Sequence, residues 1–130
     1  MSSSRLLVDT DVLIDYLRDK AEAVNFLEKN DDAIFYVSVI TVAELYAGTR
    51  NSEEKKKIEL ILLDFAVLPI DTQTAVIAGS LKQQYSKSHG TGIADALIAA
   101  TAQLHTLPLV TFNTKHFPMI SDVYPPYVKA

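Results

Sequence analysis

Three acidic residues and one amide stand where they could share a catalytic role. Asp9 follows the short apolar run Leu6–Val8, and Asn113 follows another apolar run near the end of the chain. Glu44 lies among apolar and small residues, and Asp95 follows a loop with two glycines. Carboxylates that gather in one place repel one another unless a cation lies between them. Oxygen ligands of this kind suit Mg²⁺ or Mn²⁺, so the set suggests a divalent-metal site.

Such a site would support the hydrolysis of a phosphate ester. A divalent ion held by oxygen ligands can deprotonate a water molecule, orient it and stabilise the charge that grows on a phosphodiester. The chain has no cysteine, and its three histidines include no pair at the spacing of a zinc site. The sequence therefore favours a metal-activated water over zinc or thiolate chemistry.

Each of these residues also has a simpler structural interpretation. Glu44 fits the solvent-facing side of an amphipathic helix, and Asp95 fits the first turn of a helix, where an acid complements the helix dipole. Asp9 could cap the helix that follows it, and Asn113 could be a turn residue at a strand end. No single position decides between these interpretations, so the prediction rests on the set.

The elements that must position these residues alternate between strand and helix. The expected strands are Leu6–Val8, Ile34–Val37, Val67–Ile70, Leu109–Phe112 and a short fifth strand after Ser121. The expected helices are Val12–Lys20, Ala21–Lys29, Thr41–Thr49, one starting at Ser52, one from Asp71 or Thr72 to about Ser86, and Ala94–His105, with a polar loop over residues 87–92. This alternation predicts one α/β domain over residues 1–130 with a mostly parallel sheet. Ligands of such sheets bind beyond the carboxyl ends of the strands.

The composition narrows the functional classes. Hydrophobic residues make up 48% of the 130, which is enough for a packed core. No segment approaches the ~18 uninterrupted apolar residues of a membrane span, and the N-terminal apolar run is too short for a signal peptide. We therefore expect a cytoplasmic protein with no membrane contact. The net charge of −4 argues against a broad basic surface for nucleic acid, so any such substrate must be held locally.

Four segments, taken in order, resemble the PIN domains and, within them, the VapC-type toxins. The segments are Val8–Asp15, Ser38–Gly48, Ile93–Ala102 and Leu109–Phe117. Each is weak alone, but their order and spacing match the family over nearly the whole chain. The resemblance implies a three-layer α/β/α fold. It also implies Mg²⁺- or Mn²⁺-dependent cleavage of single-stranded RNA by an activated water, which leaves a 5′-phosphate.

The resemblance also assigns roles to individual residues. The metal-binding positions fall on Asp9, Glu44 and Asp95, with Asn113 as a ligand through water. The residues expected to assist or to contact RNA are Thr10, Arg50, Thr111, Lys115 and His116. The chain departs from the family at His116, where an acid is common, and this departure predicts one tightly bound ion and a second bound weakly. VapC-type proteins usually form homodimers and are silenced by an antitoxin, so both partners are expected here.

Two other functions fit part of the pattern. A strand followed by Asp9 and Asp11 resembles the start of a haloacid-dehalogenase-type phosphatase, although Asp31-Asp32 falls too early to supply that family's later acids. A non-catalytic α/β module, such as a receiver, could instead bind a partner, with Asp71 as a poor phosphoacceptor. Outside these alternatives, we interpret Asp11 as a helix cap and Asp15 as a solvent-facing residue.

Overall fold

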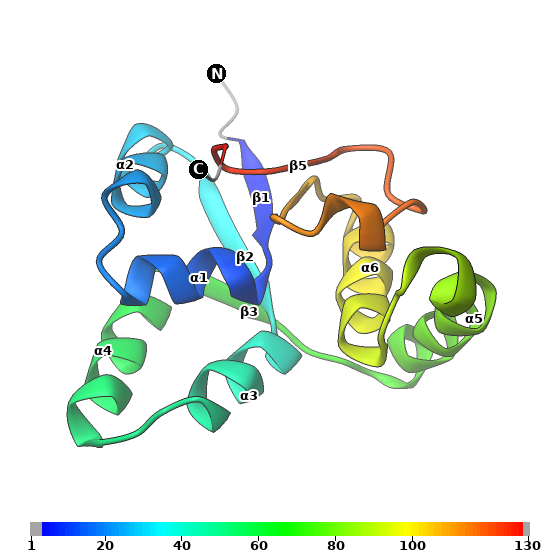
Figure 1. Ribbon diagram of the computed structural model, residues 1–130, viewed down its shortest axis with the longest axis horizontal. Helices are drawn as coiled ribbons and strands as arrows, with labels where there is room; N and C mark the ends of the chain where they lie inside the picture. The colour runs from blue at the N-terminus through cyan, green and yellow to red at the C-terminus, as the bar shows by residue number, and fades with distance from the viewer. Residues whose placement is uncertain (1–3, 129–130) are drawn as a thin grey trace.

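The structure, a computed structural model, describes residues 4–128 and alternates strands with helices as expected (Figure 1). Its elements are β1 (Arg5–Val8), α1 (Thr10–Leu17), α2 (Ala21–Lys29), β2 (Ile34–Ser38), α3 (Val39–Ala47), α4 (Ser52–Leu62), β3 (Phe65–Leu68), α5 (Thr72–His89), α6 (Ile93–His105), β4 (Leu109–Val110), the 3₁₀ helix η1 (Thr114–His116) and β5 (Val123–Tyr124). Across the part of the chain that is described, no helix is both long and apolar enough to cross a lipid bilayer.

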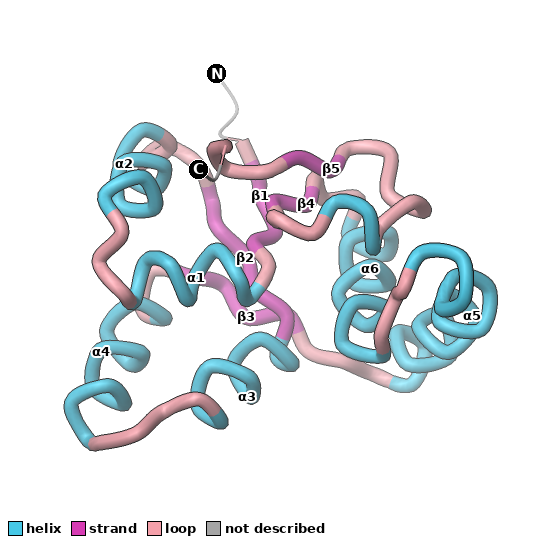
Figure 2. Tube along the Cα trace, in the orientation of Figure 1, coloured by secondary structure: helices cyan, strands magenta, loops and turns pink. Residues whose placement is uncertain are grey.

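The five strands form one sheet in which every pairing is parallel, in the order β3-β2-β1-β4-β5 (Figure 2). From β1 the chain builds β2 and then β3 to one side. It later returns to the other side of β1 to add β4 and then β5. The carboxyl ends of β1 and β4 therefore flank the point where the strand order reverses, which is where open α/β sheets bind their ligands.

Helices cover both faces of the sheet, which confirms the predicted three-layer α/β/α sandwich (Figure 1). Successive strand residues point to opposite faces. Leu7 and Leu109 pack in one core with α5 and α6. Val8 and Val110 pack in the other with α1, α3 and α4. On α6, the alanines over residues 96–102 are almost fully buried, and these small side chains let the helix lie close to its neighbours.

Local chemistry explains where several elements begin. Asp9, Ser38, Asn51 and Asp71 are the N-caps of α1, α3, α4 and α5, and each accepts a backbone N–H of its helix through its side chain. Asp9 directly follows β1, and Ser38 is the last residue of β2, so each residue lies where a strand ends and a helix starts. This arrangement aims the first turns of α1 and α3 at the carboxyl edge of the sheet.

Several predicted boundaries differ from the structure, and two of the differences have a clear physical reason. The third strand is Phe65–Leu68 rather than Val67–Ile70, because Pro69 has no N–H to donate to the ladder. The helix expected to end near Ser86 continues to His89, and so takes up half of the predicted polar loop. It ends at Gly90, whose φ of +67° is the left-handed conformation that glycine adopts readily.

Candidate active site

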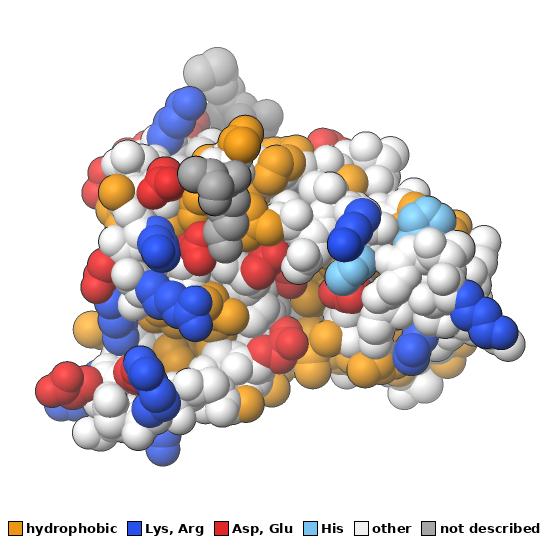
Figure 3. Space-filling model, viewed as in Figure 1, with side chains coloured by type: hydrophobic (Ala, Val, Ile, Leu, Met, Phe, Trp, Pro, Cys, Tyr) orange, Lys and Arg blue, Asp and Glu red, His pale blue; other side chains and the backbone are white. Residues whose placement is uncertain are grey.

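The predicted acids meet in one cavity of about 210 Å³ at the carboxyl edge of the sheet. Its lining includes Asp9, Glu44, Asp95 and Asn113, together with Asp11. Acidic side chains gather in the hollow at the middle of the face shown in Figure 3. The cavity thus collects carboxylates from α3, α6 and the end of β1, which are far apart in the chain.

Asp9 is held at the switch point of the sheet by two hydrogen bonds. Its Oδ1 accepts the N–H of Thr10 at 2.7 Å, and its Oδ2 accepts the hydroxyl of Thr111 at 2.7 Å. Thr111 directly follows β4, the strand paired with β1. The two strands that flank the switch point are therefore linked through this carboxylate, which is 5% exposed.

The surroundings of Asp9 disfavour its negative charge. Burial is the main cause, and the nearby charge of Asp11 adds to it, so the pKa of Asp9 is raised from 3.8 to about 7. The hydrogen bonds from Thr111 and Thr10 oppose this rise, and the charge of Asp95 contributes to it. A cation in the cavity would offset the cost of ionising Asp9.

Glu44 reaches the same cavity from α3 while remaining exposed to solvent. The Thr10 hydroxyl donates to Glu44 Oε1 at 2.7 Å and lies 3.0 Å from the hydroxyl oxygen of Thr41. Glu44 is therefore solvent-facing, as one interpretation expected, and it also lines the cavity, while its role as a metal ligand stays a prediction. Thr10 orients this carboxylate and, through its backbone N–H, also binds Asp9.

Asp95 lies in the first turn of α6, where its Oδ2 accepts the N–H of Gly92 at 3.0 Å. The same oxygen lies 3.4 Å from His116 Nδ1. The backbone carbonyl of His116 accepts the Thr91 hydroxyl at 2.7 Å, and the imidazole ring lies against Gly90. The loop before α6 and the η1 helix thus hold one oxygen of Asp95 from two sides.

Asp11 belongs to the site, and its interpretation as a helix cap is wrong. Its Oδ2 accepts the backbone N–H of Phe112 and the side-chain amide of Asn113, both at 3.1 Å. The pattern in the sequence that could have revealed this is the Asp-Thr-Asp order after β1, once β4 is known to lie next to β1. Asp11 is a first-turn acid of α1, and it organises the end of β4.

The interpretation of Asp15 as solvent-facing is also wrong, because this residue is buried at 4% exposure. Its Oδ2 accepts the hydroxyl of Tyr127 at 2.8 Å.

Three other residues predicted from the sequence lie outside the acid cavity. Among the expected RNA contacts, Lys115 lies exposed on η1, and Arg50 lines a neighbouring groove. Asp71 caps α5 and does not line the cavity.

The donor set of the cavity matches a hard divalent cation in its chemistry. Four carboxylates and one carboxamide line it, and these oxygen donors are the ones that Mg²⁺ and Mn²⁺ prefer. Within residues 4–128, no three His, Asp or Glu side chains form a ready-made coordination group. Binding an ion would therefore draw these side chains inward, and the relief of their mutual repulsion would favour that movement.

Comparison with known proteins agrees with this arrangement. The model of the PIN domain family matches residues 6–122, which is most of the chain. This chain belongs to the PIN domain family. Its membership agrees with the parallel sheet flanked by helices, and it decides against the phosphatase interpretation of Asp9 and Asp11.

Several named proteins and solved structures are similar to this PIN domain. Ribonuclease VapC10 of Mycobacterium tuberculosis is 39% identical over 124 residues, which span 94% of this chain and 92% of that protein. Toxin FitB of Neisseria gonorrhoeae is 36% identical over 126 residues, with coverage of 86% and 90%. A chain in a toxin–antitoxin complex from Klebsiella pneumoniae superimposes with a TM-score of 0.81 at 33% identity, over 95% of this chain and 99% of that one.

Proposed function

We propose that this PIN domain is a Mg²⁺- or Mn²⁺-dependent endoribonuclease that cleaves single-stranded RNA and acts as the toxin of a toxin–antitoxin pair. The observation that carries the proposal is the meeting of Asp9, Glu44 and Asp95 in one cavity at the switch point of the sheet. The names of the relatives, a ribonuclease and a toxin, support the same activity. The reaction adds water across the P–O3′ bond and leaves 5′-phosphate and 3′-hydroxyl ends.

In this proposal the acids hold the ion and their neighbours orient them. Asp9, Glu44 and Asp95 would hold the metal, with Asn113 as a further ligand through water. The bound ion supplies an activated water and stabilises charge on the phosphodiester. Thr111 fixes Asp9 through the hydrogen bond to its Oδ2, and Thr10 fixes Glu44 through the hydrogen bond to its Oε1.

A second group of residues would keep this arrangement rigid. Asp11 accepts the Asn113 amide and the Phe112 N–H, so it holds the end of β4 beside the cavity. His116 and the Gly92 N–H both contact Asp95 Oδ2. Among the interactions described for Asp95, none falls on Oδ1, which leaves that oxygen for a metal. We therefore assign His116 to the positioning of Asp95 rather than to RNA contact.

The direct test is cleavage of a mixed-sequence single-stranded RNA by the purified protein with Mn²⁺, with analysis of the ends formed. We expect 5′-phosphate products, and we expect Asp95→Asn to lower the rate by about a hundredfold or more because a metal ligand is lost. Asp122→Asn, which changes an exposed acid outside the cavity, is the matched control. Equal cleavage by wild type and Asp95→Asn would refute the proposal, as would the absence of any RNA cleavage.

The partners follow from the same proposal. We infer a cytoplasmic homodimer of this single domain, silenced by an antitoxin. The acid cavity supplies a physical reason, because an antitoxin segment that carries a cation could neutralise the same carboxylates that bind the metal. The similar chain from Klebsiella pneumoniae is part of a toxin–antitoxin complex, which supports the same assembly for this protein.

A further inference from the structure

A second cavity, of about 410 Å³, lies directly beside the acid cavity between α1, α3 and α4. We call it the arginine groove, and the residues that matter here are Ile14, Arg18, Glu44, Arg50, Glu54 and Lys57. Ile14 and Glu44 line both cavities. The two hollows therefore share a wall, and a ligand that leaves the acid cavity past Glu44 enters the arginine groove.

Most of the charged side chains in the groove form ion pairs with nearby residues. Arg50 binds Glu54 with two guanidinium nitrogens, the shorter contact being 2.9 Å. Lys57 Nζ binds Asp19 at 2.9 Å and the backbone carbonyl of Leu17 at 2.7 Å. Arg18 forms no ion pair among the described residues. Of the positive charges in the groove, the charge of Arg18 is therefore the one without a negative partner.

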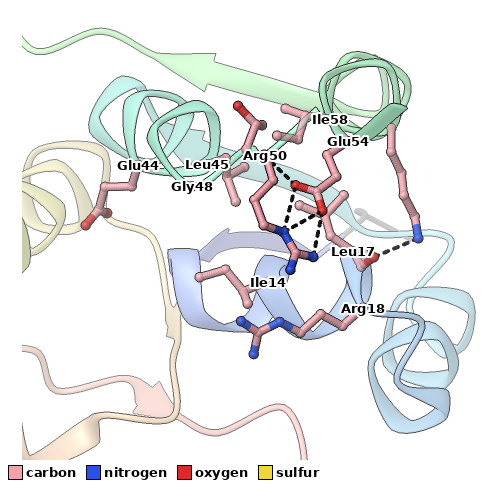
Figure 4. Close-up of a pocket in the computed structure, with 11 residues that line it drawn as sticks. Ile14, Leu17, Arg18, Glu44, Leu45, Gly48, Arg50, Glu54 and Ile58 are labelled. Carbon is pink, nitrogen blue, oxygen red and sulfur yellow. Dashed lines mark hydrogen bonds and ion pairs between the residues drawn. The ribbon is translucent and has the colours of Figure 1, made fainter. Parts of the chain in front are cut away.

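Figure 4 shows how the side chains lie in the groove. The side chain of Arg18, from the C-terminal end of α1, and that of Arg50, from the loop between α3 and α4, both lie near Ile14. Glu44 stands at the other end and points away from both guanidinium groups. The groove is thus polarised, with cationic groups at one end and the proposed metal ligand at the other.

We propose that the arginine groove binds the phosphate backbone of single-stranded RNA next to the bond that is cleaved. This inference rests on the proposed ribonuclease function and extends it by assigning a path to the substrate. Guanidinium groups recognise phosphate oxygens strongly, and single strands are commonly held in grooves of positive charge. A protein with a net charge of −4 needs such a local site, because its surface as a whole repels RNA.

Single substitutions can either lower or raise the positive charge of the groove. Arg18→Gln removes the uncompensated charge. Glu54→Gln keeps the side-chain oxygen that accepts the Arg50 N–H but releases the Arg50 guanidinium from its anionic partner. Lys56→Gln removes a positive charge from an exposed residue of α4 that does not line the groove. It therefore measures the effect of net charge alone.

The measurement is the binding of a fluorescein-labelled single-stranded RNA, followed by fluorescence anisotropy without divalent ions over a range of salt concentrations. We expect Arg18→Gln to weaken binding about three- to tenfold and to reduce the salt dependence by about 0.7 in log–log slope, the value for one phosphate contact on a single strand. We expect Glu54→Gln to tighten binding about threefold, because it raises the positive charge of the groove. Lys56→Gln should leave the affinity within about twofold of wild type.

The outcomes separate this inference from the function on which it rests. If the wild type cleaves RNA but Arg18→Gln and Lys56→Gln bind it equally well, the groove assignment is wrong and the ribonuclease proposal stands. If the wild type cleaves no RNA, the proposed function fails whatever the anisotropy shows. If Arg18→Gln and Glu54→Gln change only the binding of a purified partner protein, the groove is a protein-binding site and the RNA path is overturned.

Discussion

Helix α1 presents two buried aspartates, one at its N-cap and one near its end, and their surroundings are opposite in character. Asp9 is 5% exposed and faces other carboxylates across the acid cavity. Asp15 is 4% exposed and binds the hydroxyl of Tyr127, from the segment after β5. The two residues are equally buried, yet only Asp9 lies where a cation would relieve the burial of its charge.

This difference shows that burial alone does not identify a functional acid. Both carboxylates accept a hydroxyl donor, so the difference lies in the charges around them. A buried carboxylate with such a donor and no like charge beside it contributes to the stability of the fold. One that faces further carboxylates destabilises the metal-free protein, and it is retained for what it can bind. The same substitution, Asp to Asn, should therefore have opposite effects on stability at the two positions.

The largest effect is expected at Asp9 in the metal-free protein. The folded pKa of about 7 lies above the ordinary value of 3.8 for an aspartate, so the folded state binds the proton more tightly than the unfolded state does. The stability that comes from protonated Asp9 is therefore present below about pH 4 and is lost as pH rises toward 7. At pH 8, Asp9→Asn should raise Tm by roughly 5–8 °C, which corresponds to ~2 kcal/mol in a domain of this size.

Thermal melts with EDTA and with Mn²⁺, at pH 5 and pH 8, measure this effect. Asn can still cap α1, so the variant tests the charge rather than the cap. Mn²⁺ should raise the Tm of wild type, because it binds only the folded state, and should have much less effect on Asp9→Asn. Asp15→Asn is the matched comparison, and it should lower Tm. A lower Tm for both variants at pH 8 would contradict the comparison.

A smaller effect is expected at His116, which contacts the same cavity without lining it. An asparagine amide can take the place of Nδ1, the ring nitrogen that lies 3.4 Å from Asp95 Oδ2, whereas a glutamine amide corresponds to Nε2. His116→Gln should weaken Mn²⁺ binding about tenfold, as the loss of a residue that orients a ligand often does. His116→Asn should retain most of the affinity.

Titration of the change in Tm with Mn²⁺ distinguishes these variants without reference to activity. His105→Gln, an exposed histidine at the end of α6, controls for the loss of an imidazole. If His116→Asn and His116→Gln weaken the metal equally, His116 does not act through Nδ1. If neither weakens it, Asp95 is oriented by the Gly92 N–H alone.

The comparison also shows what sequence reasoning could reach. Strand–helix alternation follows from the spacing of apolar residues, so the fold class and the order of the elements were predictable. Asp9 and Asp95 stand at element ends, and Glu44 stands among apolar residues that disfavour a charge. Their convergence could be anticipated from the rule that ligands bind at the carboxyl ends of parallel strands. The resemblance to the PIN domains pointed to the same residues.

The roles of Asp11 and Asp15 could not be found in this way. Asp11 is part of the site because β4 lies beside β1, a pairing between residues about a hundred positions apart that no local pattern reveals. Asp15 is buried and binds the hydroxyl of Tyr127, which is 112 residues away in the chain. Amphipathic periodicity describes which face of a helix is polar, but not which distant segment covers it.

The smallest effect is expected at the hydrogen bond between the Tyr127 hydroxyl and Asp15. The Tyr127 ring packs edge-on against Phe112 with 5.1 Å between centroids, while its hydroxyl donates to Asp15. Tyr127→Phe keeps the ring contact and removes only this hydroxyl, so we expect a loss of about 1–2 kcal/mol in the free energy of unfolding, measured by urea denaturation. In the Asp15→Asn background the same substitution should cost less, because the hydroxyl no longer donates to a charged group. An equal cost in both backgrounds would show that the hydroxyl acts elsewhere and that Asp15 owes its stability to other contacts.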